Sequence, residues 1–339
     1  MKRMKQRTLG NSGIDVSEVG FGVWTISTNW WGQADDASDM LKTAFDSGIT
    51  FYDTAPAYGD DGFGETVLAP FIAEHKDEVV ITTKCGYDIH AERPKEHSER
   101  PHNWSSESIV AQVEESLTRL GLDVIDLLQL HNARMDAVEN DDLFATLNLL
   151  KEEGKIRSYG VALGPAIGWV AEGMASLENR NIDSLQTVYN ALEQEPGRTF
   201  ARHEECKAGN VSLISRVPHA SDALSGKVTR DSLNEMLQSG DHRSYRVKDN
   251  MLDNLDKADA ISYLWAPETG RTIGQAAISA ILAEPAFACV LPTCLTTEEV
   301  REYAKASDLP LSDVEIAQYS SAYDENFGHE NRFEMELRE

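Results

Sequence analysis

The chain has few cysteines and no long apolar run. Its four cysteines in 339 residues include no Cys-x-x-Cys pair, so they suggest neither a disulfide framework nor a zinc site. No apolar stretch approaches the roughly 18 residues that a membrane-spanning helix needs. The first residues, MKRMKQRTLGNSG, are basic but lack the apolar region of a signal peptide. We therefore expect a cytoplasmic protein.

Basic residues are also scarce. There are 31 Lys and Arg against 57 Asp and Glu, which gives a formal net charge of -26. This balance argues against nucleic acid and against an anionic membrane surface as partners, because both attract positive charge. The acidic residues are scattered through stretches with helical spacing, which is typical of solvated helix faces. We hypothesise a salt-adapted surface, the alternative being a merely acidic mesophilic protein; a melting temperature that falls with added KCl would contradict the hypothesis.

Glycine-rich phosphate-binding turns are missing as well. The Gly20-Phe21-Gly22 segment has no third glycine at the right place, Gly62-Phe63-Gly64 is only a pair, and no Walker-type motif is present. An open doubly wound sheet usually carries such a turn after its first strand, so the absence weighs against that fold. With 41% hydrophobic residues the chain is expected to be globular, and its length suits two domains or one α/β barrel with insertions.

What the sequence does contain is an alternation of strand and helix patterns. Apolar, β-branched stretches predict strands over 16–26, 49–55, 78–86, 123–132, 156–163, 184–190, 211–218 and 288–293. Amphipathic stretches predict helices over 36–48, 63–76 (interrupted by Pro70), 105–121, 142–155, 167–177, 199–210, 272–285 and 296–306, the last being the final helix. Eight strand–helix units predict a parallel (β/α)₈ TIM barrel. We expect one domain over 1–339, with an N-terminal extension and an insertion near 219–262.

Four polar residues fall at or just after predicted strand ends, where barrel enzymes place their catalytic groups. They are Asp53, Tyr58, Lys84 and His131. Each residue considered alone also has a non-catalytic interpretation. Asp53 would cap a turn, Tyr58 would be an ordinary loop tyrosine and His131 would be a core histidine. Lys84 is harder to dismiss, because it ends a strand expected to be buried on both faces, and a buried lysine needs a partner. Asp53 is the natural one.

These residue types together suit the reduction of a carbonyl group. A free tyrosine ionises only near pH 10, but a neighbouring ammonium favours its phenolate form. A carboxylate paired with that ammonium holds it in place, and a histidine can hydrogen-bond a carbonyl oxygen. Tyr58 would then deliver a proton while hydride adds to the carbonyl carbon. A cofactor has to supply the hydride, since no side chain can.

On these residues the sequence resembles the aldo-keto reductase family. The likeness runs from RTLGNSGIDVSEVGFGVW (7–24) to LPTCLTTEEV (291–300) and is most specific over GITFYDTAPAYGDDGFGETVLAPFI (48–72). It implies a (β/α)₈ barrel that binds NADPH, sometimes NADH, across the strand ends. It also implies that the four residues named above are the catalytic tetrad.

The resemblance also suggests cofactor contacts. Gln186 is similar to the glutamine that holds the nicotinamide carboxamide. Segment 213–227 resembles the loop around the pyrophosphate, where Arg216 and Lys227 are candidates for phosphate contact, or else loop surface charges. Segment 291–303 resembles the site of the adenosine 2′-phosphate, with three candidate residues, Thr296, Thr297 and Arg301. NADPH is the expected cofactor, with NADH left open.

Two departures from the family pattern bear on that choice. Ala162 and Leu163 occupy the place of a Ser-Asn pair that contacts the carboxamide, so one set of nicotinamide contacts is missing or replaced. Leu295 lies where a basic residue is usual. A cation there would favour NADPH over NADH, and its absence leaves the preference open.

Substrate signals are weaker. Trp24, Trp30 and Trp31 follow the first strand and would wall an apolar pocket, or else pack in the core. The loop 87–104 is long enough for a substrate wall or lid, and its three histidines, His90, His97 and His102, are too irregularly spaced to favour a metal site. We expect an NAD(P)H-dependent oxidoreductase for a small carbonyl or alcohol. The alternatives are an NAD-linked sugar or polyol dehydrogenase and a weakly active NADPH-binding regulatory subunit.

Overall fold

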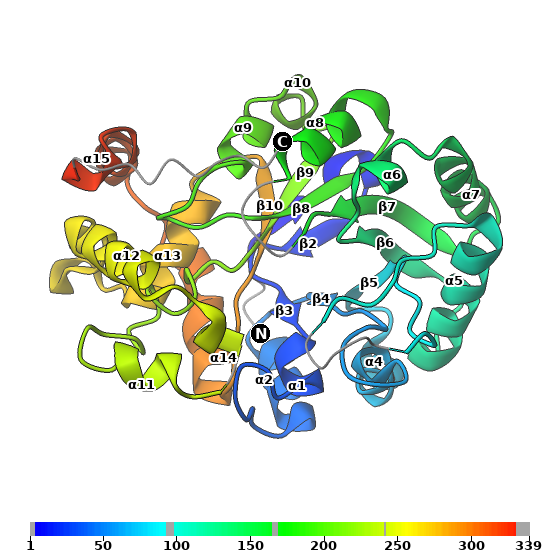
Figure 1. Ribbon diagram of the computed structural model, residues 1–339, viewed down its shortest axis with the longest axis horizontal. Helices are drawn as coiled ribbons and strands as arrows, with labels where there is room; N and C mark the ends of the chain where they lie inside the picture. Colours follow the sequence, from blue (N-terminus) through cyan, green and yellow to red (C-terminus); the bar gives the residue numbers. More distant parts are fainter. Residues whose placement is uncertain (1–3, 93–97, 165–168, 241, 330–339) are drawn as a thin grey trace.

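The computed structural model contains a closed barrel of parallel strands (Figure 1). It describes residues 4–92, 98–164, 169–240 and 242–329. In chain order the barrel strands are β3 (Phe21–Gly22), β4 (Phe51–Asp53), β5 (Val80–Cys85), β6 (Ile125–His131), β7 (Ile156–Ala162), β8 (Ser184–Val188), β9 (Ser212–Arg216) and β10 (Phe287–Leu291). Each pairs with the next, and a bridge from Val19 to Val290 together with the Gly20 amide bond to the Val290 carbonyl (2.9 Å) joins the two ends. The predicted (β/α)₈ barrel is confirmed.

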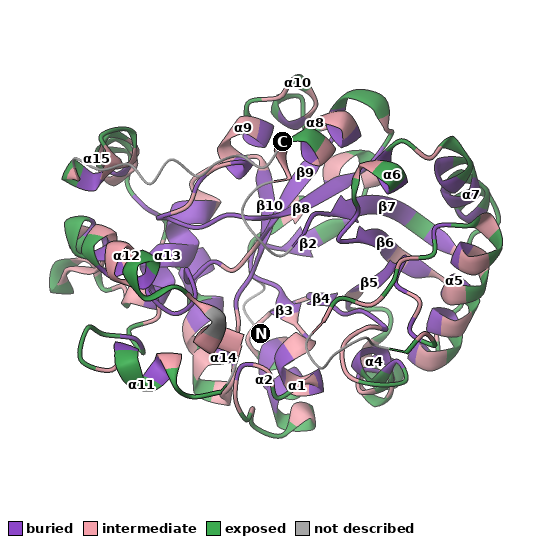
Figure 2. Cartoon of the chain, in the orientation of Figure 1, coloured by how far each residue is buried: buried purple, intermediate pink, exposed green. Residues whose placement is uncertain are grey.

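Helices surround the barrel and expose their outer faces, whereas most residues of the barrel strands are buried (Figure 2). Those that follow the strands most directly are α2 (Ala37–Asp46), α4 (Ala69–His75), α5 (Ser106–Leu120), α7 (Asp141–Glu152), α8 (Val170–Asn179), α13 (Ile273–Leu282) and α14 (Thr297–Ala304). Their ends follow local signals: the Ser105 side chain accepts from the Ser108 amide, and Gly121 stops α5 at a left-handed φ of 67°. Segment 63–76 is interrupted as predicted, but the break lies between α3 (Phe63–Thr66) and α4, and Pro70 is in the first turn of α4.

The N-terminal extension forms the floor of the barrel. Strands β1 (Gln6–Thr8) and β2 (Asp15–Ser17) pair as an antiparallel hairpin. An apolar cluster joins the hairpin to the barrel interior, from Leu9, Ile14 and Val16 to the buried Phe51 and Leu127. The barrel is therefore filled at this end, and its open mouth lies at the carboxyl ends of the strands.

Three predicted elements were wrong in detail. Segment 16–26 is not one strand. It contains the end of β2, the short barrel strand β3 and the start of the helix α1 (Trp24–Ser27). Segment 199–210 splits into α9 (Gly197–Ala201) and α10 (Glu204–Lys207), since the His203 side chain accepts from the Glu205 amide and begins a new helix. The last helix is not 296–306 but α15 (Asp313–Asp324), which begins with a capping box of Ser312 and Glu315.

The insertion near 219–262 packs on one side of the barrel. It contains α11 (Leu233–Leu237) and α12 (Lys248–Ala260), which lie on the same side as α13 and α15 in Figure 1. Leu224, Met251 and Leu255 of the insertion share a buried apolar cluster with Tyr319 of α15. Within the described ranges, no helix has both the length and the apolar character needed to cross a membrane.

Candidate active site

Lys84 and Asp53 form a buried ion pair inside the barrel. Lys84 is 1% exposed, and its Nζ donates to Asp53 Oδ2 at 2.7 Å and to the Thr54 carbonyl at 2.9 Å. Burial works to lower the pKa of Lys84, but the charge of Asp53 and the contact with Tyr58 outweigh it, and the pKa is raised. The ammonium therefore persists, and the pairing expected from the sequence is present.

Asp53 is held from two further strands. Its Oδ1 accepts from the Gln129 amide of β6 at 3.1 Å and from the Gln186 amide of β8 at 3.3 Å. All these side chains are buried. The carboxylate that holds Lys84 in position is thus itself held by hydrogen bonds from two other strands of the barrel.

Tyr58 reaches the same group from the loop after β4. The Lys84 Nζ lies 5.0 Å from the centre of its ring, so the ammonium is next to the tyrosine. The loop can bend this tightly because the Gly64 amide donates to the Tyr58 carbonyl at 2.8 Å. An added Cβ at Gly64 would lie 2.7 Å from Tyr58 Cβ, so only glycine permits this approach.

His131 ends β6 and faces Tyr58 across the mouth of the barrel. Their ring centroids are 5.7 Å apart and nearly perpendicular. Burial lowers the pKa of His131 well below its ordinary value, and the positive charges of Lys84, Arg216 and His102 lower it further. The imidazole is therefore neutral at neutral pH and retains one N–H to donate.

Tyr87, which sequence reasoning missed, lies against the other face of His131, with ring centroids 4.7 Å apart. Its hydroxyl accepts from Asn132 Nδ2 at 2.7 Å and donates to Glu99. His102 stacks on Tyr87 at 4.2 Å and donates to the His131 carbonyl at 2.9 Å. The described parts of loop 87–104 thus build a wall beside His131. The available signal was that Tyr87 follows Lys84 by three residues at a strand end.

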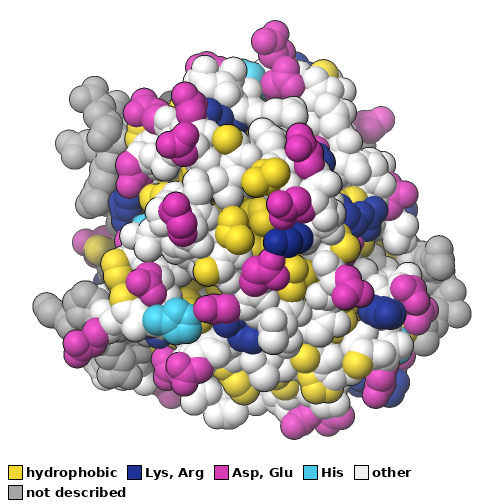
Figure 3. All heavy atoms as spheres, turned by 90° about the vertical axis from the view of Figure 1, so that its right-hand side faces the viewer, with side chains coloured by type: hydrophobic (Ala, Val, Ile, Leu, Met, Phe, Trp, Pro, Cys, Tyr) yellow, Lys and Arg dark blue, Asp and Glu magenta, His cyan; other side chains and the backbone are white. Residues whose placement is uncertain are grey.

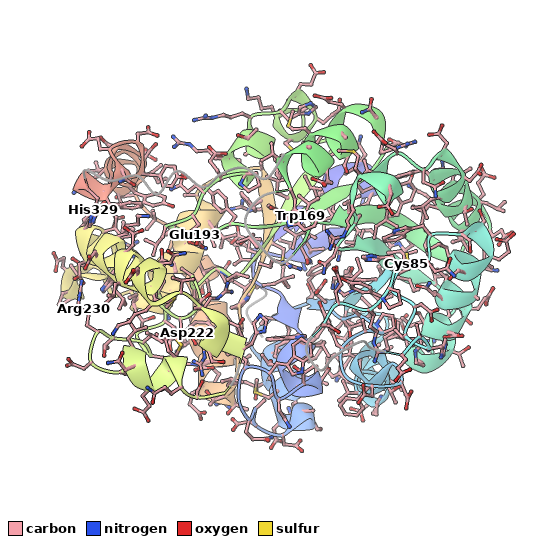
Figure 4. The ribbon with its side chains drawn as sticks, in the orientation of Figure 1. Cys85, Trp169, Glu193, Asp222, Arg230 and His329 are labelled. Carbon is pink, nitrogen blue, oxygen red and sulfur yellow. The ribbon has the colours of Figure 1, made fainter. Side chains whose placement is uncertain are left out.

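A cavity of about 980 Å³ opens above these groups and is lined by all three predicted tryptophans. Trp24 lies 6.1 Å from Trp30 and 5.9 Å from Trp31, and His242 of the insertion packs among them. Asp222, in the loop after β9, accepts from Trp31 Nε1 at 3.2 Å and from Arg243 at 2.7 Å. Figure 4 shows Asp222 on the side of the insertion helices. His242 and Arg246 of the insertion line the cavity.

The predicted cofactor contacts are brought to the cavity in part. Gln186, expected at the nicotinamide, and Arg216, expected at a phosphate, both line it. Gly22 lines it as well, and an added Cβ there would meet nothing within 4 Å. Ala162 and Leu163 are buried and present no polar side chain there. An open shelf with an amide at its edge fits a flat ring that carries a carboxamide.

The residues expected at the adenosine phosphates do not line the cavity and have other partners. Lys227 pairs with Glu299, and Arg301 lies 3.4 Å from Glu298. The Thr296 side chain caps α14, and the Thr297 amide donates to Asp35 at 2.9 Å. The surroundings of this helix start, which we call the α14 end, are therefore acidic.

The two described histidines of loop 87–104 have separate partners. His90 is paired with Glu115 at the surface, His102 lies in the aromatic stack, and His97 lies outside the described residues. Within the part of the chain that the structure describes, no three His, Cys, Asp or Glu side chains are grouped to hold a metal ion.

Comparisons with known proteins agree with this architecture. The sequence pattern of the Aldo/keto reductase family matches residues 18–324. The uncharacterized oxidoreductase YqkF of Bacillus subtilis is 30% identical over 90% of this chain and 92% of its own. The NADH-specific methylglyoxal reductase of Escherichia coli is 29% identical over 92% of this chain and 96% of its own.

Two solved structures share the fold. An aldo-keto reductase from Bacillus halodurans, in its holo form, superposes with a TM-score of 0.72 at 24% identity, covering 99% of this chain and 100% of its own. The glycerol dehydrogenase of Gluconobacter oxydans superposes with a TM-score of 0.74 at 21% identity, covering 96% and 97%. Together with the sequence match over nearly the whole barrel, these findings show that the chain belongs to the aldo/keto reductase family of oxidoreductases.

Proposed function

We propose that the protein reduces the carbonyl group of a small molecule with a nicotinamide cofactor, and that Tyr58 donates the proton. One observation carries this proposal: Asp53, Lys84 and Tyr58 form a continuous chain of contacts that ends at the cavity, opposite a neutral His131. No structural role needs a lysine buried beneath a half-exposed tyrosine, and burying the pair has a desolvation cost.

Each residue has a defined task. The His131 N–H and the Tyr58 hydroxyl both donate to the carbonyl oxygen, which orients it and stabilises the negative charge that develops there. As the oxygen gains the Tyr58 proton, the Lys84 ammonium stabilises the phenolate left behind. Asp53 keeps that ammonium in position.

A bound nicotinamide supplies the hydride. Gln186 and the shelf above Gly22 are the features that would hold its ring, and the tryptophans would exclude water from it. The same groups serve alcohol oxidation, in which the Tyr58 phenolate accepts the proton instead.

Charge at the α14 end favours NADH over NADPH. The family resemblance points to NADPH, but Asp35, Glu298 and Glu299 all surround this helix start. A 2′-phosphate would meet these carboxylates, and the two nearby cations, Lys227 and Arg301, are already paired with them. The NADH-specific relative in E. coli supports the same choice. An NAD-linked sugar or polyol dehydrogenase remains the second candidate for this reason.

The test is a fluorescence titration of the purified protein with NADH and NADPH in KCl, followed by turnover of a mixed aldehyde panel. Tyr58→Phe should bind the cofactor as the wild type does and lose about 10²- to 10⁴-fold in kcat, the usual contribution of a positioned proton donor. Cofactor binding without any turnover would favour the regulatory-subunit alternative. Binding of neither cofactor would overturn the proposal.

A further inference from the structure

Arg216 is a cation at the mouth of the barrel for which the described residues supply no partner. It ends β9 and lines the cavity. Among the residues that the structure describes, its side chain makes no hydrogen bond and no ion pair, and its Nε is buried without an acceptor. A guanidinium presents five N–H donors, so an unpartnered one in a cavity calls for an acceptor from outside the chain.

The surroundings of Arg216 place its charge at the reaction end of the cavity. Burial lowers the pKa of its guanidinium, and interactions with Tyr58, Asp53 and Tyr87 oppose that effect. Arg216 in turn acts on His131. These are the groups that would surround the substrate carbonyl. Because Asp53 is already paired with Lys84, it does not neutralise the charge of Arg216.

A count of the charges that line the cavity gives the same result. Its acidic side chains are each paired: Asp53 with Lys84, Asp60 with Arg100 at 3.4 Å and Glu99 with Arg134 at 2.5 Å. Two further arginines line it, Arg216 and Arg246, and among the described residues neither forms an ion pair. The cavity is thus positive inside a chain of net charge -26. Such an inversion of sign favours an anionic ligand.

We propose that Arg216 binds a carboxylate of the substrate, so that the substrate is a short oxo acid and the product a hydroxy acid. This inference rests on the proposed function and names its substrate class. Guanidinium and carboxylate pair in a planar, bidentate way, which would fix the carbonyl between Tyr58 and His131. The carbonyl carbon gains the hydride, its oxygen gains the Tyr58 proton, and the carboxylate is unchanged. Arg216 is therefore a specificity-determining residue and moves no proton.

The rival ligand is a phosphate of the cofactor, the role that the family resemblance gives to Arg216. A pyrophosphate lies remote from the reacting carbon, whereas the interactions of Arg216 are with the reacting groups themselves. The two readings differ in what an Arg216 variant changes: the affinity for cofactor or the preference among substrates.

The experiment uses substrate pairs that differ only in the carboxylate. Pyruvate is compared with methyl pyruvate, and succinic semialdehyde with butanal, at one fixed KCl concentration. The wild type should prefer the carboxylate member of at least one pair by about 10- to 100-fold in kcat/KM, as expected for a charge-assisted bidentate bond. Arg216→Gln should bring that ratio to within about threefold of unity, chiefly through KM, and Arg216→Lys should restore part of it.

Arg157→Gln is the matched control. Arg157 is an exposed residue near the start of β7, at the opposite end of the barrel, and pairs with Asp126 at 2.6 Å. The Arg157→Gln variant makes the same change in net charge as Arg216→Gln. It should leave the kcat/KM ratio between the carboxylate substrate and its uncharged partner unchanged. A wild-type ratio near one for both pairs, or an Arg216→Gln enzyme that keeps the wild-type ratio, would overturn the inference. So would an Arg216→Gln variant that lost only cofactor affinity.

A binding measurement separates this inference from the proposed function. Lactate and methyl lactate are titrated into the protein, with and without cofactor, using the fluorescence of the tryptophans that line the cavity. Lactate should bind the wild type at least 10-fold more tightly than Arg216→Gln does, and methyl lactate should not distinguish them. That result without turnover would retain the anion site and reject the reductase. Equal lactate binding by the two proteins would reject the anion site whatever the turnover.

Discussion

The two ends of the proposed cofactor path differ in charge and in burial. At the reaction end, the side chains of Lys84 and Asp53 are 0% and 6% exposed, and positive groups are in excess. At the α14 end, the side chains of Arg301 and Glu298 are 53% and 78% exposed, and acidic groups are in excess. Because a buried charge needs its partner and an exposed charge does not, the first end tolerates little change and the second is free to vary.

The largest expected difference between the two ends comes from removing one partner of each ion pair. Lys84→Met leaves Asp53 buried without a counter-charge, which should destabilise the protein by about 3–5 kcal/mol. It also leaves the Tyr58 phenolate without the ammonium, so turnover should fall by at least about 10³-fold. Arg301→Met breaks an exposed pair and should change stability by less than about 1 kcal/mol. Urea unfolding and steady-state kinetics measure both.

A double variant shows whether the Lys84 effect is electrostatic. Lys84→Met with Asp53→Leu removes both charges and should recover part of the lost stability while leaving the enzyme inactive. If Lys84→Met were as stable as the wild type, the buried pair would not have the energetic role given to it above.

The same contrast explains which parts of the molecule the sequence predicts well. The reaction end follows from strand periodicity, because parallel strands in a closed barrel bring the ends of β4, β5 and β6 together. Asp53 is in register with Thr82, and Lys84 lies two residues further along β5, on the same face as Thr82. A lysine after an apolar run already requires a partner. The predicted secondary structure was wrong where the chain changes direction, as in segment 16–26. Local propensity does not show that the N-terminal hairpin closes one end of the barrel.

The loop after β9 could not be predicted in this way. Val217, Ala220, Ser221 and Asp222 all adopt positive φ without being glycine, so no turn signal in the sequence marks its path. That path decides where Asp222 lies and therefore its contacts with Trp31 and Arg243. Acidic side chains are scattered over the face of the molecule that Figure 3 shows, and the net charge of the chain is -26. A count of charges along the chain therefore does not predict that the cavity lining is cationic.

A smaller effect is expected from reversing the charge balance at the α14 end. Glu299→Gln removes one carboxylate and releases Lys227, while the new amide oxygen can still accept from the Leu295 amide. The affinity for NADPH relative to NADH should rise about 10-fold, the value of roughly one charged contact. Fluorescence titration with both cofactors measures the ratio.

Glu114→Gln is the control for this change. Glu114 pairs with Lys155 on the outer side of the barrel, so the variant alters net charge without touching the α14 end. It should leave the cofactor ratio unchanged. A Glu299→Gln protein with the wild-type ratio would mean that the adenosine does not lie at this helix start.

The smallest expected effect concerns two buried histidines, one at each end. Burial lowers the pKa of His219 to about 4, with Asp222 and Glu299 opposing and Lys227 assisting. At His131 the cations Lys84 and Arg216 instead add to the effect of burial. The neighbouring charges therefore act with burial at His131, whereas two carboxylates act against it at His219. Titration of the imidazole resonances by NMR should show both histidines still neutral well below their ordinary pKa, with His219 protonating near pH 4.

Stability against pH gives an independent measure of the same groups. The unfolded chain takes up protons on these imidazoles near their ordinary value of 6.5, whereas the folded protein does so only at much lower pH. The free energy of unfolding should therefore decrease as the pH falls from about 6.5 toward 4, by about 1 kcal/mol per pH unit for each histidine. His219→Gln should reduce that slope by the contribution of one group, and a slope equal to that of the wild type would show that His219 titrates normally in the fold.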